Sequence, residues 1–270
     1  MRSSFRAATR LLVYFGFTVV LLPVQIVAVQ LGLPLAGRLP VFFHRLCCRI
    51  LGFTVEVNGV RSRSVPTLFV SNHVSYIDIT VLGSLIRGSF IAKAEVGDWP
   101  LFGLLAKLQR TVFIERRGIR ATAQRDELTR RLEAGDDLIL FPEGTSDDGN
   151  TVLPFKSALF AVAETTVNGA PLTVQPVSIA YVALDGMPLG RAFRPRYAYY
   201  GDMSLLPHLW EMLGWGVVTV SVTFHEPIDA GAFASRKTLA LHCHHVVAGG
   251  VEAAISGRRR PVPAPGLAHS

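Results

Sequence analysis

A run of 27 residues between Arg10 and Arg38 contains no lysine, arginine, histidine, aspartate or glutamate. A helix needs about 20 apolar residues to cross the hydrocarbon core of a bilayer, so this run is long enough to enter a membrane. The apolar region of a cleaved signal peptide spans only roughly 7 to 15 residues, although the arginines before the run keep that alternative open. We therefore expect residues 1–60 to form a membrane-associated helical segment.

Two features predict that this segment is not one straight span. Pro23 lies near its centre and Gly32-Leu33-Pro34 near its end, and proline removes a helical hydrogen bond and bends the helix. Positive charge near both ends favours the cytoplasmic side of the membrane for both, where it is attracted to an anionic leaflet. The arginines concerned are Arg2, Arg6, Arg10, Arg38, Arg45 and Arg49. We expect a kinked or re-entrant hairpin on the cytoplasmic face of a membrane, with a single crossing as the alternative.

Composition narrows the class of partner. The 270 residues carry a net charge of +7, yet only 17% of them are charged, against about 25% in soluble proteins. A basic balance suits nucleic acid, anionic lipid or phosphorylated substrates. We find no zinc-finger spacing, basic zipper or RNA-binding signature, so membrane lipids are expected as partners and nucleic acid is not. The three cysteines, two of them adjacent, form no disulfide framework and fit a reducing compartment.

Short β-rich runs alternating with helical periodicity begin after residue 65 and predict an α/β domain over residues 61–256. We expect a mixed central sheet flanked by helices. The predicted strands are 67–71, 89–94, 111–115, 137–141, 172–182, 196–200 and 217–224, and the predicted helices are 119–133, 155–167 and 235–256. The basic, proline-containing tail over residues 257–270 is expected to be disordered or to lie on lipid headgroups.

The segment Asn72-His73-Val74-Ser75-Tyr76-Ile77-Asp78 directly follows the first predicted strand. A neutral imidazole accepts a proton from a hydroxyl, and a carboxylate on its other nitrogen stabilises the resulting imidazolium. Residues five apart in one helix lie about 140° from each other. The two side chains can pair if His73 lies in the turn before a helix and Asp78 in the first turns of that helix. The alternative is a simple turn in which Asn72 or Ser75 caps the helix.

Two further strand ends carry polar residues. Phe141-Pro142-Glu143-Gly144-Thr145-Ser146 places a carboxylate, a glycine and two hydroxyls where an open sheet binds ligands. Arg116 ends the strand Thr111-Val112-Phe113-Ile114-Glu115, and its planar guanidinium suits a phosphate or a carboxylate. An ordinary turn and a solvated surface charge are the respective alternatives. His242-Cys243-His244-His245 lacks further ligands at suitable spacing, so we expect no metal site.

The order NHVSYID, FIER, FPEGTS and VQPVSIAY resembles the glycerolipid acyltransferase family, which includes bacterial 1-acyl-sn-glycerol-3-phosphate acyltransferases. The resemblance covers roughly residues 65–182. It implies that His73 is the general base and Asp78 its partner, that Arg116 binds the anionic head of a lysolipid, and that Glu143, Gly144 and Thr145 help to hold this acceptor. The implied reaction moves a fatty acyl group from acyl-CoA or acyl-carrier protein to 1-acylglycerol 3-phosphate, giving phosphatidic acid.

The sequence departs from the family pattern at two positions. Arg110 stands where a glycine usually opens the second motif, and Ser146 stands where an arginine commonly follows Gly-Thr. By this resemblance, both positions belong to the part of the motifs that binds the acceptor head group. The stretch 147–156 resembles a branch that includes acyltransferases of ornithine-containing lipids, so a lyso-ornithine lipid or another lysolipid is the alternative acceptor.

Direct attack by the acceptor hydroxyl is the expected mechanism. The sequence contains no Gly-x-Ser-x-Gly nucleophile elbow and no cysteine within a motif, so no acyl-enzyme is indicated. Backbone N–H groups near His73 are expected to stabilise the oxyanion, and no cofactor is required. A hydrolase that uses the same residues with water, and a non-catalytic membrane scaffold, are the competing functions.

Overall fold

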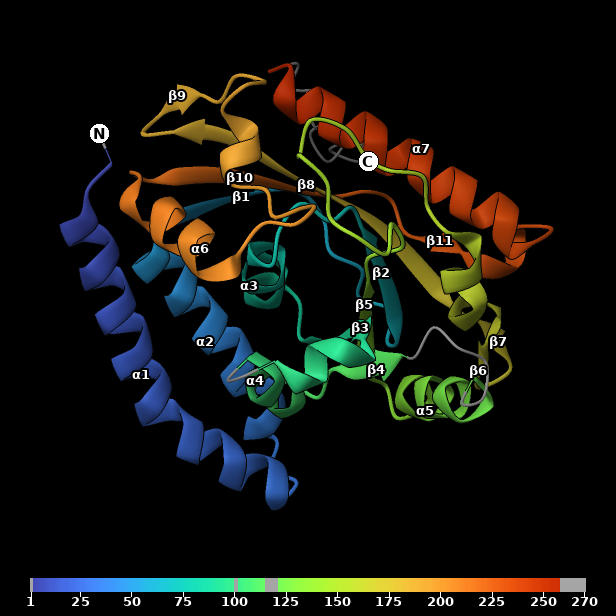
Figure 1. Cartoon of the computed structure of the whole chain (residues 1–270). Helices are drawn as coiled ribbons and strands as arrows, with labels where there is room; N and C mark the ends of the chain where they lie inside the picture. Colours follow the sequence, from blue (N-terminus) through green and yellow to red (C-terminus); the bar gives the residue numbers. More distant parts are fainter. Residues whose placement is uncertain (1, 100–101, 115–120, 258–270) are drawn as a thin grey trace, which may run out of the picture.

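The computed structural model describes residues 2–99, 102–114 and 121–257 (Figure 1). Within them a nine-stranded mixed sheet forms the centre of the chain, as expected from the sequence. Its main path runs β1-β10-β8-β2-β5-β3-β4, with β9 and β11 also paired to β8. The strands are β1 (Phe53–Gly59), β2 (Thr67–Ser71), β3 (Gly88–Lys93), β4 (Val112–Ile114), β5 (Asp137–Leu140), β8 (Thr173–Leu184), β9 (Met187–Pro188), β10 (Val218–Phe224) and β11 (Ile228–Asp229).

Strand direction decides where a site can form in this sheet. The neighbours from β8 through β2, β5 and β3 to β4 are all parallel, whereas β10 runs antiparallel to β8 and parallel to β1. The carboxyl ends of β2, β5 and β4, which the sequence motifs follow, therefore lie along one edge of the sheet. Loops at this edge are the usual ligand-binding positions of parallel sheets.

Helices cover both faces of the sheet (Figure 1). Alternate residues of β2 point to opposite faces, because Phe69 belongs to one buried cluster while Leu68 and Val70 belong to the other. The first cluster includes residues of α3 and α6, and the second includes residues of α5 and α7. The α-helices are α1 (Ser4–Gln30), α2 (Leu35–Leu51), α3 (Ile77–Leu85), α4 (Phe102–Leu108), α5 (Ala121–Glu133), α6 (Leu205–Gly214) and α7 (Arg236–Ile255).

The amino-terminal segment is a helical hairpin in which α2 runs back beside α1 (Figure 1). Pro23 lies inside α1, which continues through it to Gln30. Helix α2 ends at Gly52 in the left-handed conformation, with φ of 85°, and the chain then enters β1. Residues 53–59 were expected within the helical segment but form a strand, because the alternating Phe53, Val55 and Val57 pair with β10. Both ends of the hairpin thus meet the sheet domain.

Helix α1 is long and apolar enough to cross a membrane by length and composition. Its most apolar 18-residue window has a mean hydropathy of 2.3, and only 17% of that window is buried. Large apolar side chains are exposed along the helix: Leu12, Val13, Phe15, Val19, Val20, Val24 and Val27. A contiguous apolar surface of this kind marks a membrane or protein contact rather than a surface that faces water.

Arg10 fastens α1 to the carboxyl end of α6. Its guanidinium donates to the carbonyl oxygens of Leu213 at 3.0 Å, Trp215 at 2.8 Å and Gly216 at 3.0 Å. The last carbonyls of a helix have no partner within the helix, and a cation is favoured there. This arginine, expected beside lipid headgroups, therefore stabilises the junction between hairpin and domain.

Two predicted elements differ from the structure. Residues 196–200 form no strand, since the 3-10 helix η4 (Arg194–Arg196) precedes a loop in which Tyr197 packs on Tyr181. Residues 155–167 form no α-helix either, because the 3-10 helix η3 (Ser157–Glu164) ends before β6 (Thr166–Val167), which pairs with β7 (Ala170–Pro171). The β-branched run Thr165-Thr166-Val167 favours an extended chain over a helix.

Candidate active site

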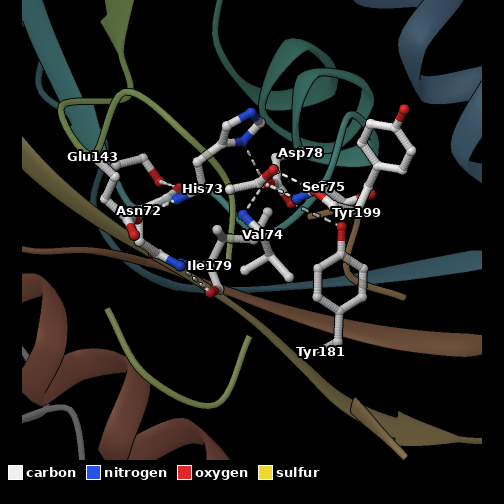
Figure 2. A network of polar contacts seen from close by, with 11 residues as sticks. Asn72, His73, Val74, Ser75, Asp78, Glu143, Ile179, Tyr181 and Tyr199 are labelled. Carbon is white, nitrogen blue, oxygen red and sulfur yellow. Dashed lines mark hydrogen bonds and ion pairs between the residues drawn. The ribbon is translucent and has the colours of Figure 1, made fainter. Parts of the chain in front are cut away.

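His73 and Asp78 lie together at the carboxyl end of β2, as the sequence predicts (Figure 2). His73 lies in the turn that follows the strand, and Asp78 is the second residue of α3. Nδ1 of His73 is 2.9 Å from Oδ2 of Asp78. The same carboxylate oxygen also accepts from the backbone N–H groups of Val74 at 2.6 Å and Ser75 at 2.8 Å. The turn is thus folded around a fully buried carboxylate.

This geometry leaves the other imidazole nitrogen available for chemistry. An ionised carboxylate only accepts hydrogen bonds, so Nδ1 of His73 carries the proton that is shared with Asp78. The neutral ring then has its lone pair on Nε2, and the His73 side chain is 22% exposed. A histidine held in this tautomer accepts a proton from a bound hydroxyl, and the carboxylate stabilises the imidazolium that results.

Tyr181 completes the surroundings of Asp78 and was not predicted as a site residue. Its hydroxyl donates to Oδ1 of Asp78 at 2.8 Å, from the neighbouring strand β8 (Figure 2). Burial, followed by the charge of Asp78, raises the pKa of Tyr181 well above its ordinary value. The phenol therefore stays protonated and acts as a donor. Its place in the motif VQPVSIAY, one strand away from His73, was the only signal in the sequence.

Asn72 and Phe141 fix the backbone and the ring of the proposed base. The amide of Asn72 donates to the carbonyl of Ile179 at 2.9 Å and accepts from its N–H at 2.9 Å, which joins the end of β2 to β8. Asn72 is therefore not the helix cap considered as an alternative. The Phe141 ring stacks on the imidazole of His73, with ring centroids 4.2 Å apart and planes at 18°.

Glu143 contacts the backbone on both sides of the site. The N–H of His73 donates to one carboxylate oxygen at 2.6 Å, and the N–H of Leu153 donates to the other at 2.9 Å. The side chain is 2% exposed. Burial raises the pKa of Glu143 to about 8, although the two N–H bonds lower it. The sequence motifs suggest that Glu143 holds the acceptor. In the structure, its hydrogen bond instead positions the backbone of His73.

The other predicted site residues differ in how closely they approach His73. Gly144 adopts the left-handed conformation with φ of 65°, and Thr145 is exposed. Both belong to the loop that follows β5, the direct neighbour of β2. Arg116 lies outside the described residues. The strand before it, β4, reaches the same edge of the sheet, but β3 and β5 separate it from β2.

An apolar pocket of about 210 Å³ lies between the hairpin and the sheet domain. Helices α1, α2, α4 and α6 line it, together with Tyr76, Ile77 and Phe90. The Phe90 ring stacks on Phe141 at 6.0 Å, and Phe141 stacks in turn on His73. The pocket therefore reaches Phe90, whose ring packs on the Phe141 ring that stacks on the imidazole. Its lining suits a hydrocarbon chain.

A family model described as acyltransferase matches residues 53–180, which include β1 and every site residue named above except Tyr181. A lyso-ornithine lipid O-acyltransferase of Brucella abortus (strain 2308) is 45% identical over 245 residues, covering 89% of this chain and 92% of the relative. The chain belongs to the acyltransferase family. It is an acyltransferase of the lysolipid type, and the family implies an acyl donor and a lysolipid acceptor.

More distant members share the same core. A 1-acyl-sn-glycerol-3-phosphate acyltransferase of Neisseria gonorrhoeae is 33% identical over 173 residues, which cover 64% of each chain. The crystal structure of the 1-acyl-sn-glycerophosphate (LPA) acyltransferase PlsC from Thermotoga maritima has the same fold, with a TM-score of 0.66 and 24% identity over 95% of this chain and 99% of the other. The apolar helix α1 and the bacterial lipid acyltransferases among its relatives together indicate that this acyltransferase associates with membranes.

Proposed function

We propose that this acyltransferase transfers a fatty acyl group from acyl-CoA or acyl-carrier protein to the free hydroxyl of a lyso-ornithine lipid. The observation that carries this choice is the 45% identity to a lyso-ornithine lipid O-acyltransferase, which extends over 89% of the chain and 92% of the relative. The likeness to a 1-acylglycerol-3-phosphate acyltransferase is weaker and shorter. The acceptor first expected from the sequence, 1-acylglycerol 3-phosphate, is therefore less well supported than its alternative.

The site geometry supports direct acyl transfer from donor to acceptor, without an acyl-enzyme. Nε2 of His73 takes the proton from the lysolipid hydroxyl while the hydroxyl oxygen attacks the thioester carbonyl. Asp78 stabilises the imidazolium that forms, with the bond from Tyr181 holding the carboxylate in place. Collapse of the tetrahedral intermediate restores the carbonyl of the new ester, breaks the carbon–sulfur bond and passes the proton from His73 to the leaving thiolate.

The oxyanion needs donors other than those nearest to His73. The N–H group of His73 is bound to Glu143, and those of Val74 and Ser75 are bound to Asp78. A donor that already serves a buried carboxylate is not available for a second anion. Arg116, Gly144 and Thr145 remain proposed contacts to the acceptor, as the family resemblance implies.

The apolar pocket and the hairpin supply the lipid side of the proposal. A fatty acyl chain bound in the pocket would extend from the region of His73 between α1, α2 and α4. We further propose that the hairpin lies in the cytoplasmic leaflet of the bacterial inner membrane, because both of its ends return to the domain that carries the site. The donor thioester is then reached from the cytoplasm.

The test is acyl transfer by purified protein in membranes, with labelled acyl donor and a panel of lysolipids. Labelled product should appear with lyso-ornithine lipid at a higher kcat/KM than with 1-acylglycerol 3-phosphate or other lysolipids. Release of free fatty acid without an acceptor would indicate the hydrolase alternative. A lack of any acylated lipid, with the protein folded and inserted, would favour the scaffold.

A further inference from the structure

The loop over residues 141–156 contacts His73 at three places, one of which is the hydrogen bond from the His73 N–H to Glu143 described above. The ring of Phe141 stacks on the imidazole, and the N–H of Asp147 donates to the carbonyl oxygen of His73 at 3.3 Å. Between these two points the loop turns through Gly144. The backbone of this loop therefore lies next to the proposed base, near the position where the acceptor must present its hydroxyl.

Several contacts fix the shape of the 141–156 loop. The hydroxyl of Ser146 donates to the carbonyl oxygen of Tyr199, and the N–H of Lys156 donates to that of Pro142 at 2.9 Å. Asn150 donates to Asp148 at 2.9 Å and accepts from the buried guanidinium of Arg194. A loop held in this way presents its remaining side chains in a fixed arrangement before the substrate binds.

Two of these remaining side chains carry opposite charges. Asp147 is half-buried, and its Oδ2 accepts from Thr151 at 3.3 Å, while its Oδ1 has no hydrogen-bond partner among the residues that the structure describes. Lys156 is exposed, and its ammonium lies over Gly144, because a Cβ built on Gly144 would be 3.0 Å from Nζ. Among the ion pairs of the described residues, none joins Asp147 to Lys156.

We propose that Asp147 and Lys156 form a binding subsite for the zwitterionic amino-acid head group of the acceptor. The carboxylate of Asp147 would accept from the side-chain ammonium of ornithine, and the ammonium of Lys156 would bind its carboxylate. This inference rests on the proposed function. A separated pair of opposite charges matches a head group with both charges, whereas Asp147 repels a phosphate at the same position.

The chemistry at residue 146 agrees with this assignment. Arginine commonly follows Gly-Thr in the family motif, but here Ser146 uses its hydroxyl to hold the loop to Tyr199. The loop thus lacks a cation at that position and carries Asp147 directly after it. This change disfavours a doubly negative head group and favours one that also bears an ammonium.

The test compares two acceptors, lyso-ornithine lipid and 1-acylglycerol 3-phosphate, in wild-type protein and in Asp147→Asn and Lys156→Gln. Asp147→Asn should raise the KM for lyso-ornithine lipid by roughly 5-fold to 50-fold, because a charge-assisted bond at a partly exposed site is lost. Exposed Lys156 should contribute less, roughly 3-fold to 10-fold. For 1-acylglycerol 3-phosphate, Asp147→Asn should leave the KM unchanged or lower it.

Asp202→Asn and Lys237→Gln are the matched controls, because both residues are exposed and lie outside the 141–156 loop. They should leave all constants unchanged. If wild-type protein acylates 1-acylglycerol 3-phosphate but not lyso-ornithine lipid, the proposed function itself fails. If wild-type protein acylates lyso-ornithine lipid and neither loop variant changes its KM, the subsite is refuted while the proposed function stands. An equal fall in kcat for both acceptors in Asp147→Asn would also refute it, since Asp147 would then act on His73.

Discussion

The hydroxyl of Tyr181 and the imidazole of His73 bind different oxygens of the same buried carboxylate, that of Asp78. Among the residues that the structure describes, four donors surround this carboxylate, two of them backbone N–H groups of the turn. Its orientation is therefore fixed by the neighbouring strand β8 as well as by its own helix. The tyrosine acts on the reaction only through Asp78 and His73, so it is a positioning residue.

Tyr181→Phe should lower kcat by roughly 3-fold to 10-fold and the stability by about 1 to 3 kcal/mol, because a buried carboxylate loses a donor. Steady-state kinetics and thermal unfolding in detergent would measure both effects. Tyr197→Phe is the matched control, since Tyr197 stacks on Tyr181 but its own buried hydroxyl has no partner in the described residues. Equal effects of the two substitutions would contradict the role of the Tyr181 hydroxyl.

His73→Ala should leave the protein folded and bound to membranes while acyl transfer falls by roughly 100-fold to 10,000-fold, the usual contribution of a general base. Asp78→Asn should also be impaired, because an amide stabilises no imidazolium and favours the wrong tautomer. Residues that act as one unit are strongly non-additive. The double variant should therefore be hardly slower than His73→Ala alone, and near-normal transfer by folded His73→Ala would refute the mechanism.

Glu143→Gln should lower kcat with little change in either KM, because an amide offers only one acceptor to the N–H groups of His73 and Leu153. Kinetics with varied donor and varied acceptor would separate this outcome from a binding role. A large rise in the acceptor KM at unchanged kcat would instead support the contact to the acceptor that the sequence implies. Thr145→Val, at an exposed proposed acceptor contact on the same loop, should show the opposite pattern, a raised acceptor KM at little changed kcat.

The pKa of Glu143 predicts opposite pH trends for activity and stability. Both carboxylate oxygens accept N–H bonds fully only when the group is ionised, so kcat should rise as pH passes through about 8. A folded-state pKa above the ordinary 4.5 means that its contribution to stability is complete below pH 4.5 and is lost as pH rises through about 8. Parallel measurements of kcat and of unfolding between pH 5 and pH 9, in wild-type and Glu143→Gln protein, would test this. Identical pH profiles of the two proteins would contradict it.

Arg10→Gln should loosen α1 from α6 and lower the stability by roughly 1 to 3 kcal/mol, because the carbonyl oxygens of Leu213, Trp215 and Gly216 lose charged donors. Thermal unfolding in detergent would measure this. Arg6→Gln removes a nearby charge that makes no such contact in the described residues and is the control. Equal stability of both variants would mean that Arg10 does not fasten the hairpin.

The proposed topology can be tested with sealed vesicles of known orientation. Protease should digest the domain after residue 65 in inside-out vesicles and spare it in right-side-out vesicles, while α1 stays with the lipid in both. Protection of the domain in inside-out vesicles would contradict the cytoplasmic assignment.

The sequence predicted contacts within one local unit better than contacts between strands. His73 and Asp78 lie in one turn and the helix start that follows it, directly after β2, so the pattern of residues 67–78 was sufficient to bring them together. Tyr181 and Glu143 reach the same turn only because β8 and β5 are the two neighbours of β2. This strand order leaves no trace in the periodicity of any one segment. The strand expected over residues 196–200 failed for a related reason, because Tyr197 is buried by a ring on another strand rather than by sheet pairing.

Helix α1 presents apolar side chains to the outside and also forms one wall of the pocket. In the proposed leaflet position, a fatty chain would pass sideways from bilayer to pocket and exchange one hydrocarbon surrounding for another. Such a transfer gains almost nothing from the hydrophobic effect, because lipid tails are as apolar as the side chains of the pocket. Discrimination between fatty chains would then depend on their length and shape alone. Substitutions in α1, where it lines the pocket, would change which chain lengths are accepted.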